Sequence, residues 1–119
     1  MRVLVVDDEP LSRRGVRLRL ERHDDVLAIA ECGDGEQAVE LLKEQAFDIA
    51  FLDVRMPGLS GFDVLDALPA ERRPLPIMLT AYDQYALRAF EAAAVDYLLK
   101  PIDDARFDEA LGRARKHLH

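Results

Sequence analysis

Arg2-Val3-Leu4-Val5-Val6-Asp7-Asp8-Glu9 is an apolar run that ends abruptly in three acidic side chains. Three later runs end in a similar way: Ile49-Ala50-Phe51-Leu52 stops at Asp53, Ile77-Met78-Leu79 at Thr80, and Tyr97-Leu98-Leu99 at Lys100-Pro101. If the four runs are parallel strands, their carboxyl ends share one edge of a sheet, where open α/β folds place their sites. The sequence therefore predicts that three carboxylates, a hydroxyl and an ammonium group converge at that edge.

Strand and helix patterns alternate along the whole chain. Residues Val26 to Cys32 are predicted to form a second strand, followed by a turn and by a helix that Asp34 and Gln37 would cap. Five strand–helix repeats predict a parallel sheet with helices on both faces. We expect a flavodoxin-like, doubly wound (βα)5 fold, with five strands in the order 2-1-3-4-5 and the switch point between the first and third strands.

Apolar spacing predicts which side of each helix faces the sheet. The first helix begins at Pro10, and the third begins near Gly61 and ends before Pro69. The predicted inward residues are Leu11, Gly15 and Leu18 in the first helix, Ala38, Val39, Leu42 and Ala46 in the second, Ala86, Ala89, Phe90 and Ala93 in the fourth, and Phe107, Leu111, Ala114 and Leu118 in the last.

Size and composition limit the classes of protein. The 119 residues fit one domain, residues 1–119, and the net charge of −7 argues against binding of DNA or RNA by this segment itself. Cys32 is the only cysteine, so no intrachain disulfide can form. No apolar stretch approaches the ~20 residues of a membrane span, so we expect no membrane contact and a cytoplasmic location.

The acidic edge needs a compensating charge or proton. Two carboxylates ~4 Å apart repel by ~4 kcal/mol at an effective dielectric constant of 20, so the cluster must hold a proton, spread apart or bind a cation. His23, His117 and His119 lie at a helix end and at the C-terminus, which leaves oxygen ligands and favours Mg²⁺. Beside Mg²⁺ a carboxylate can attack phosphorus, and an aspartyl phosphate on Asp53 would result.

Each of these residues also has an ordinary structural explanation. An aspartate after a strand is more often a turn or cap residue, Thr80 a strand-end hydroxyl, and Lys100 a solvated charge. Their arrival at one edge favours the functional interpretation. The Lys100-Pro101 bond is left open between a cis bond that turns the ammonium group towards the acids and a trans bond that starts the next loop.

The chain resembles the receiver domain of two-component response regulators over essentially its full length. The motifs that carry this resemblance are Val3–Glu9, Phe51–Gly58, Leu79-Thr80-Ala81 and Leu99-Lys100-Pro101. The stretches Thr80–Glu91 and Ala94–Leu99 resemble the LytR/AlgR subgroup, in which a LytTR-type DNA-binding domain follows. We expect that domain to be absent from this chain, which is then either an excised module or a stand-alone receiver, with DNA reached only through the missing domain.

The resemblance implies a role for each site residue. Asp53 would accept a phosphoryl group from a sensor histidine kinase, Asp8 and Asp53 would ligate Mg²⁺, Asp7 would assist, and the carbonyl oxygen of Arg55 would complete the protein ligands. Lys100 would pair with Asp53 and then with the phosphoryl oxygens, Thr80 would move to bind the phosphoryl group, and Tyr97 would swing inward.

At the level of the whole domain, the resemblance implies a phosphorylation-dependent switch rather than an enzyme with an external substrate. Phosphorylation would lead to a homodimer through the fourth helix, fifth strand and fifth helix. Arg55 and Tyr82, two residues after Asp53 and Thr80, are expected to border the phosphoryl group and to control access of the attacking water.

Three other interpretations fit the sequence less well. A haloacid-dehalogenase-type phosphohydrolase would carry its nucleophile in an Asp-x-Asp pattern after the first strand, where this chain has Asp7-Asp8-Glu9, and it would need a cap domain. A flavin module would need small residues with free amides after that strand, and the acidic residues there would repel its phosphate. A receiver-like domain that is never phosphorylated is disfavoured by the intact acid cluster.

Overall fold

The computed structural model describes residues 1–118 and contains one five-stranded sheet in the order β2-β1-β3-β4-β5. Every neighbouring pair of strands is parallel. The strands are β1 (Arg2–Val6), β2 (Ala28–Cys32), β3 (Ile49–Asp53), β4 (Leu75–Thr80) and β5 (Asp96–Leu99). The predicted doubly wound topology is confirmed, although β2 begins at Ala28 rather than at Val26.

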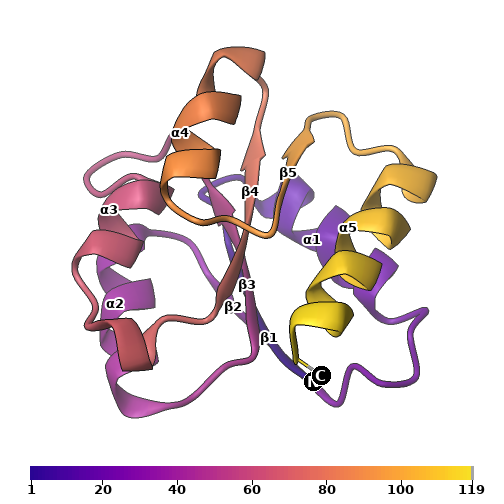
Figure 1. Cartoon of the computed structure of the whole chain (residues 1–119), viewed down its shortest axis with the longest axis horizontal. Helices are drawn as coiled ribbons and strands as arrows, with labels where there is room; N and C mark the ends of the chain where they lie inside the picture. The colour runs from indigo at the N-terminus through magenta and orange to yellow at the C-terminus, as the bar shows by residue number, and fades with distance from the viewer. Residues whose placement is uncertain (119) are drawn as a thin grey trace.

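Helices cover both faces of the sheet (Figure 1). The α-helices are α1 (Pro10–Leu20), α2 (Gly35–Glu44), α3 (Gly61–Asp66), α4 (Ala86–Glu91) and α5 (Asp104–Leu118), and two short 3₁₀ helices are η1 (Ala70–Arg72) and η2 (Asp83–Tyr85). Helices α1 and α5 lie on one face, and α2, α3 and α4 lie on the other.

Alternating strand residues supply the two cores. Val3 and Val5 of β1 belong to the core beneath α1 and α5, whereas Leu4 and Val6 belong to the core beneath α2, α3 and α4. All four side chains are fully buried, as expected for a parallel sheet covered on both faces. In the first core the rings of Phe51 and Phe107 stack, with their centroids 5.2 Å apart.

Side-chain caps fix where α2 and α3 begin. Asp34 Oδ1 accepts a hydrogen bond from the backbone N–H of Gln37 at 2.8 Å, as the sequence predicts. A reciprocal capping box precedes α3: Ser60 Oγ accepts from the N–H of Asp63 at 3.1 Å, and the N–H of Ser60 donates to Asp63 Oδ2 at 2.9 Å. This box holds the loop that follows β3.

The predicted inward face of α1 is wrong. Val16 and Leu20 are buried, whereas Leu11 is 84% exposed and Leu18 is 48% exposed. Two arginines fix the rotation of the helix: Arg13 Nη1 donates to the carbonyl of Asp7 at 2.7 Å, and Arg19 Nη2 donates to that of Ile102 at 2.9 Å. These bonds leave Val16 and Leu20 facing the sheet.

The faces predicted for the other helices are partly correct. In α4 only Ala89 is buried, and Phe90 is 81% exposed. This helix ends at Glu91, so Ala93 lies beyond it, with φ of +58°. Ala46 likewise lies beyond the end of α2. In α5 the predicted Phe107, Leu111 and Ala114 are buried.

No helix within residues 1–118 is long and apolar enough to cross a membrane. Cys32, at the end of β2, is a buried free thiol. His119 lies outside the described residues.

Candidate functional site

The carboxyl ends of four strands bring the predicted site residues to one edge of the sheet. Asp7 follows β1, Asp53 ends β3, Thr80 ends β4 and Lys100 follows β5. Asp7, Asp53 and Thr80 are at most 4% exposed, so three polar side chains are buried where the apolar strands stop. A pocket of about 220 Å³ opens above them and is lined by Asp8, Glu9, Asp53, Arg55, Thr80, Ala81, Tyr82 and Lys100.

The ammonium group of Lys100 lies among three carboxylates. Its Nζ is 2.8 Å from Asp7 Oδ2, 3.1 Å from Glu9 Oε1 and 3.2 Å from Asp53 Oδ2. Burial lowers the pKa of Lys100, but its hydrogen bond to Asp7 and the negative charges of Asp53 and Asp7 raise that pKa by more. Lys100 is therefore a fixed positive charge at the centre of the site.

Asp7 and Asp53 share this cation unequally. Burial raises the pKa of Asp7, but bonds from Lys100, Ser12 and the N–H of Glu9 outweigh burial and hold the pKa below its usual value. Burial and the neighbouring charge of Asp7 raise the pKa of Asp53 to about 7. The two carboxylates titrate as a pair, and the proton that the pair retains near neutral pH resides mainly on Asp53.

Four carboxylates could hold a cation here. One carboxylate oxygen from each of Asp7, Asp8, Glu9 and Asp53 lies within 4.8 Å of the others, with Asp8 and Glu9 on the exposed side. Asp7 Oδ2 is buried, and the Lys100 ammonium group lies 2.8 Å from it. An all-oxygen donor set with an open side fits Mg²⁺.

The predicted ligand Arg55 contacts Asp53 through its backbone. Its N–H donates to Asp53 Oδ1 at 3.2 Å, so the loop after β3 already curls over the carboxylate. The Arg55 guanidinium group lies over the ring of Tyr82, 5.0 Å from the ring centroid. The two residues expected to border a phosphoryl group are thus in contact with each other.

Thr80 and Tyr97 both bind the backbone of Tyr82. Thr80 Oγ1 accepts from the N–H of Tyr82 at 3.1 Å, and the Tyr97 hydroxyl donates to the carbonyl of Tyr82 at 3.0 Å. A displacement of Thr80 would therefore act on the same loop residue that Tyr97 holds. The contact between Tyr97 and Tyr82 joins β5 to the β4–α4 loop and could not be read from the sequence.

Two further residues belong to the site. The carboxylate of Glu9 binds Lys100, and Arg13 binds the carbonyl of Asp7. Glu9 could have been predicted from the sequence, because it is the third acidic residue after the first apolar run. Arg13 could not, because its contact depends on the rotation of α1. The Lys100-Pro101 bond, which the sequence left open, is cis.

Comparison with known proteins places this arrangement in a family. Residues 3–112 match the family described as the response regulator receiver domain, so the chain belongs to that family. This confirms the resemblance drawn from the motifs.

Individual relatives agree with this assignment and with the LytR/AlgR subgroup. The chain is 42% identical over 116 residues to the transcriptional regulatory protein BtsR of Escherichia coli, and 43% identical over 117 residues to the sensory transduction protein LytT of Bacillus subtilis. Each match covers 98% of this chain and 48% of the relative, so the chain spans about half the length of the curated relatives it matches.

A solved structure shows the same fold. The response regulatory domain of protein mrkE from Klebsiella pneumoniae has a TM-score of 0.87 and 27% identity, with 98% of this chain and 97% of that chain covered.

Proposed function

We propose that this receiver is a phosphorylation-dependent switch in which Asp53 accepts a phosphoryl group from a sensor histidine kinase. The observation that supports the proposal best is the environment of Asp53: a buried carboxylate 3.2 Å from the Lys100 ammonium group and within 4.8 Å of three other carboxylates. Such a site opposes the ionised form of Asp53 until a cation or a phosphoryl group changes the balance of charge.

The transfer exchanges one bond for another. An oxygen of the ionised Asp53 attacks phosphorus as the bond from phosphorus to the kinase histidine nitrogen breaks, and the imidazole leaves with that electron pair. Lys100 neutralises a phosphoryl oxygen from its place beside Asp53. Mg²⁺, held by Asp7, Asp8, Asp53 and the carbonyl of Arg55, would supply the remaining neutralisation of charge.

The signal then passes through Thr80 and Tyr97. A phosphoryl group adds acceptor oxygens at Asp53, and the Thr80 hydroxyl gains a partner only in that state, which is the differential contact that a switch requires. When Thr80 turns towards the phosphoryl group, its bond to the N–H of Tyr82 is lost. The β4–α4 loop and the Tyr97 ring then repack together.

The output is regulation of transcription through a separate LytTR-type DNA-binding domain, with phosphorylation promoting a homodimer through α4, β5 and α5. The transcriptional regulatory protein BtsR supports this output, since it is about twice as long as the region matched here. We also propose that the domain turns over no external substrate and that it acts in the cytoplasm.

Intact mass after treatment with acetyl phosphate and Mg²⁺ tests the chemistry. We expect one phosphoryl adduct on the wild type, none on Asp53→Ala, and an unchanged adduct on Asp24→Ala, the same change at an exposed aspartate. Chelation of Mg²⁺ should abolish the adduct. An adduct that persists in Asp53→Ala would reject the assignment, and sustained release of phosphate from small esters would favour the phosphohydrolase interpretation.

A further inference from the structure

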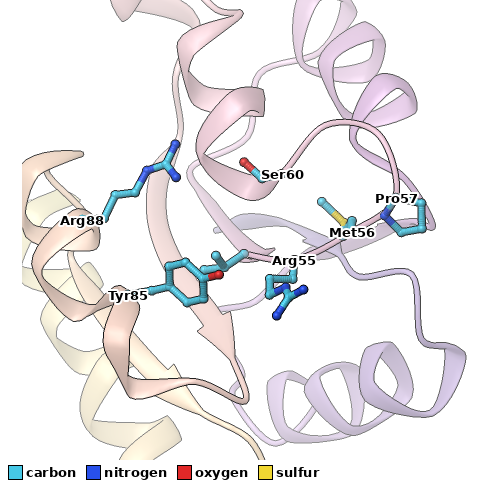
Figure 2. Close-up of a pocket in the computed structure, with 7 residues that line it drawn as sticks. Arg55, Met56, Pro57, Ser60, Tyr85 and Arg88 are labelled. Atoms are coloured by element: carbon cyan, nitrogen blue, oxygen red, sulfur yellow. The ribbon is translucent and has the colours of Figure 1, made fainter.

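A second pocket lies beside the proposed phosphoacceptor site, with Arg55 lining both (Figure 2). Its volume is about 510 Å³, within the range of small-molecule sites. Figure 2 shows Tyr85 and Arg88 facing the β3–α3 loop with Arg55, Met56, Pro57 and Ser60. The pocket therefore lies between two segments that the switch must move relative to each other.

The polar side chains of this pocket have unused donors. The Ser60 hydroxyl accepts from the N–H of Asp63, so its own hydrogen is free to donate. Within residues 1–118 the guanidinium groups of Arg55 and Arg88 and the hydroxyl of Tyr85 make no hydrogen bond to the protein. Since arginine offers five N–H donors and no acceptor, the pocket suits a ligand rich in acceptor oxygens.

The charge of the pocket points the same way. None of its lining side chains is a carboxylate, and no carboxylate oxygen of the described residues lies within 4.0 Å of a side-chain nitrogen of Arg55 or Arg88. Each guanidinium group instead lies over a ring, Arg55 over Tyr82 at 5.0 Å and Arg88 over Phe62 at 4.5 Å. Asp63 is close enough to Arg88 for the arginine to help lower its pKa, but its main partner is Ser60. Both arginines of the pocket thus carry a charge that no carboxylate of the described residues neutralises by direct contact.

We propose that this pocket binds a small anion in which a phosphate or carboxylate group is joined to an apolar body. The acidic group would bind the Arg88 guanidinium group and the Ser60 hydroxyl, both of which line the pocket, in charge-assisted hydrogen bonds, while Arg55 adds positive charge on the opposite side. The apolar body would contact Val54, Met56, Pro57 and the Tyr85 ring.

Such a ligand would bridge the β3–α3 loop to η2 and α4. Tyr85 is three residues from Tyr82, the residue that Thr80 and Tyr97 hold. A bound anion would therefore favour one arrangement of the switch loop over the other. This regulatory consequence rests on the proposed phosphorylation function, whereas binding itself does not.

Phenylphosphonate is a suitable probe, because its P–C bond cannot transfer a phosphoryl group to Asp53. We expect a titration without Mg²⁺, followed by ¹H–¹⁵N NMR, to give saturable shifts of the amides in residues 54–60 and 85–88. Benzoate tests the carboxylate alternative to phosphate. Neutral benzyl alcohol should bind at least about tenfold more weakly, because it lacks the charge that the arginines recognise.

Matched variants decide the role of the charge. Arg88→Met should weaken phenylphosphonate binding by about tenfold or more, and Arg88→Lys should restore part of the lost affinity. Arg14→Met, the same change at an exposed and unpaired arginine of α1, should alter the affinity by less than about twofold. Absence of saturation with both acids, equal binding of benzyl alcohol, equal losses in Arg88→Met and Arg14→Met, or shifts confined to the Asp53 pocket would each overturn the proposal. A failure of Asp53 to become phosphorylated would leave this result unaffected.

Discussion

Asp7 and Asp53 are buried neighbours of one lysine, yet their pKa values move in opposite directions. Asp7 lies closer to the Lys100 ammonium group and also accepts the N–H of Glu9 at 2.9 Å. Asp53 is left with a longer ion pair and the repulsion of Asp7. Asp53, the residue proposed to react, is thus the one of the two whose ionised form is less stable. A divalent cation would stabilise that ionised form.

This imbalance predicts a pH-dependent stability. The pKa of Asp53 is raised from 3.8 to about 7, so the folded state holds this proton more tightly than the unfolded chain does. The resulting stabilisation is complete below the unfolded pKa and is lost as the pH rises through the folded value. In magnesium-free buffer, we expect the free energy of unfolding of the wild type to fall relative to Asp53→Asn by roughly 2–4 kcal/mol between about pH 4 and pH 8.

Urea denaturation at several pH values measures this difference. Because other carboxylates titrate in both proteins, only the gap between the two curves reports on Asp53. Added Mg²⁺ should reduce the slope, since a cation stabilises the ionised carboxylate. Parallel curves for wild type and Asp53→Asn without Mg²⁺ would contradict the raised pKa.

Arg55 and Tyr82 line the outer side of the proposed phosphoacceptor pocket. Since their side chains stack, each holds the other in place over the path by which water would reach a phosphoryl group. We expect Arg55→Asn and Tyr82→Ala each to speed autodephosphorylation by roughly two- to tenfold, the range that loss of one cation–π contact allows. The double variant should be no faster than the faster single variant, because the pair acts as one unit. Loss of phosphate from radiolabelled protein gives the rates. Unchanged rates in both single variants would show that Arg55 and Tyr82 do not restrict the access of water.

At the scale of elements, the first turn of α3 packs so closely on β3 that only glycine fits at residue 61. A Cβ atom there would lie 2.6 Å from the carbonyl oxygen of Asp53 and 2.9 Å from Met78 Cε. We therefore expect Gly61→Ala to reduce the free energy of unfolding by about 1–3 kcal/mol and to slow phosphorylation by displacing the end of β3.

Gly112 is the matched control, because a Cβ atom on this residue of α5 meets nothing within 4 Å. Gly112→Ala should stabilise the protein by about 0.5–1 kcal/mol through helix propensity and leave phosphorylation unchanged. Thermal and urea unfolding of the two variants compare the effects. Equal stability changes of the same sign would contradict the close approach at residue 61.

Strands were easier to predict than helix faces, for a physical reason. A strand buried on both sides, such as Val3–Val6, is apolar at every position, so its place in the sheet and the acids that follow it could be read directly. In α1 two rows fit helical spacing, Leu11-Gly15-Leu18 and Val16-Leu20, and local pattern does not choose between them. The choice is made by Arg13 and Arg19, whose partners come from the residue after β1 and from the segment after β5.

The same limit applies within the site. Strand ends predicted that Asp7, Asp53, Thr80 and Lys100 would meet, because parallel strands fix where their carboxyl ends lie. The contacts of Tyr82 with Thr80 and Tyr97 depend on the path of a loop, which no periodicity describes.

At the scale of the whole molecule, exposed apolar side chains gather on α4 and β5. Leu87 is 68% exposed, Phe90 is 81% exposed and Leu99 is 45% exposed. The neighbouring α5 is held to β5 by Asp96, which binds Arg106 and Arg113 at 2.9 Å each, so this face is built on a fixed frame. It is the face through which we propose that phosphorylated copies pair.

Beryllofluoride with Mg²⁺, which mimics the phosphoryl group, should therefore convert the receiver from monomer to dimer in analytical ultracentrifugation. Phe90→Ala should weaken the dimer by about 2 kcal/mol, or roughly thirtyfold in dissociation constant, as expected for a central aromatic contact. Leu11→Ala, at a leucine of similar exposure on α1 across the sheet, should leave the dissociation constant unchanged.

Since each copy carries a net charge of −7 and the phosphoryl mimic adds more negative charge, the copies repel and salt should strengthen the dimer. A receiver that stays monomeric with beryllofluoride at both low and high salt, or that loses its dimer equally in the two variants, would show that this face has another use.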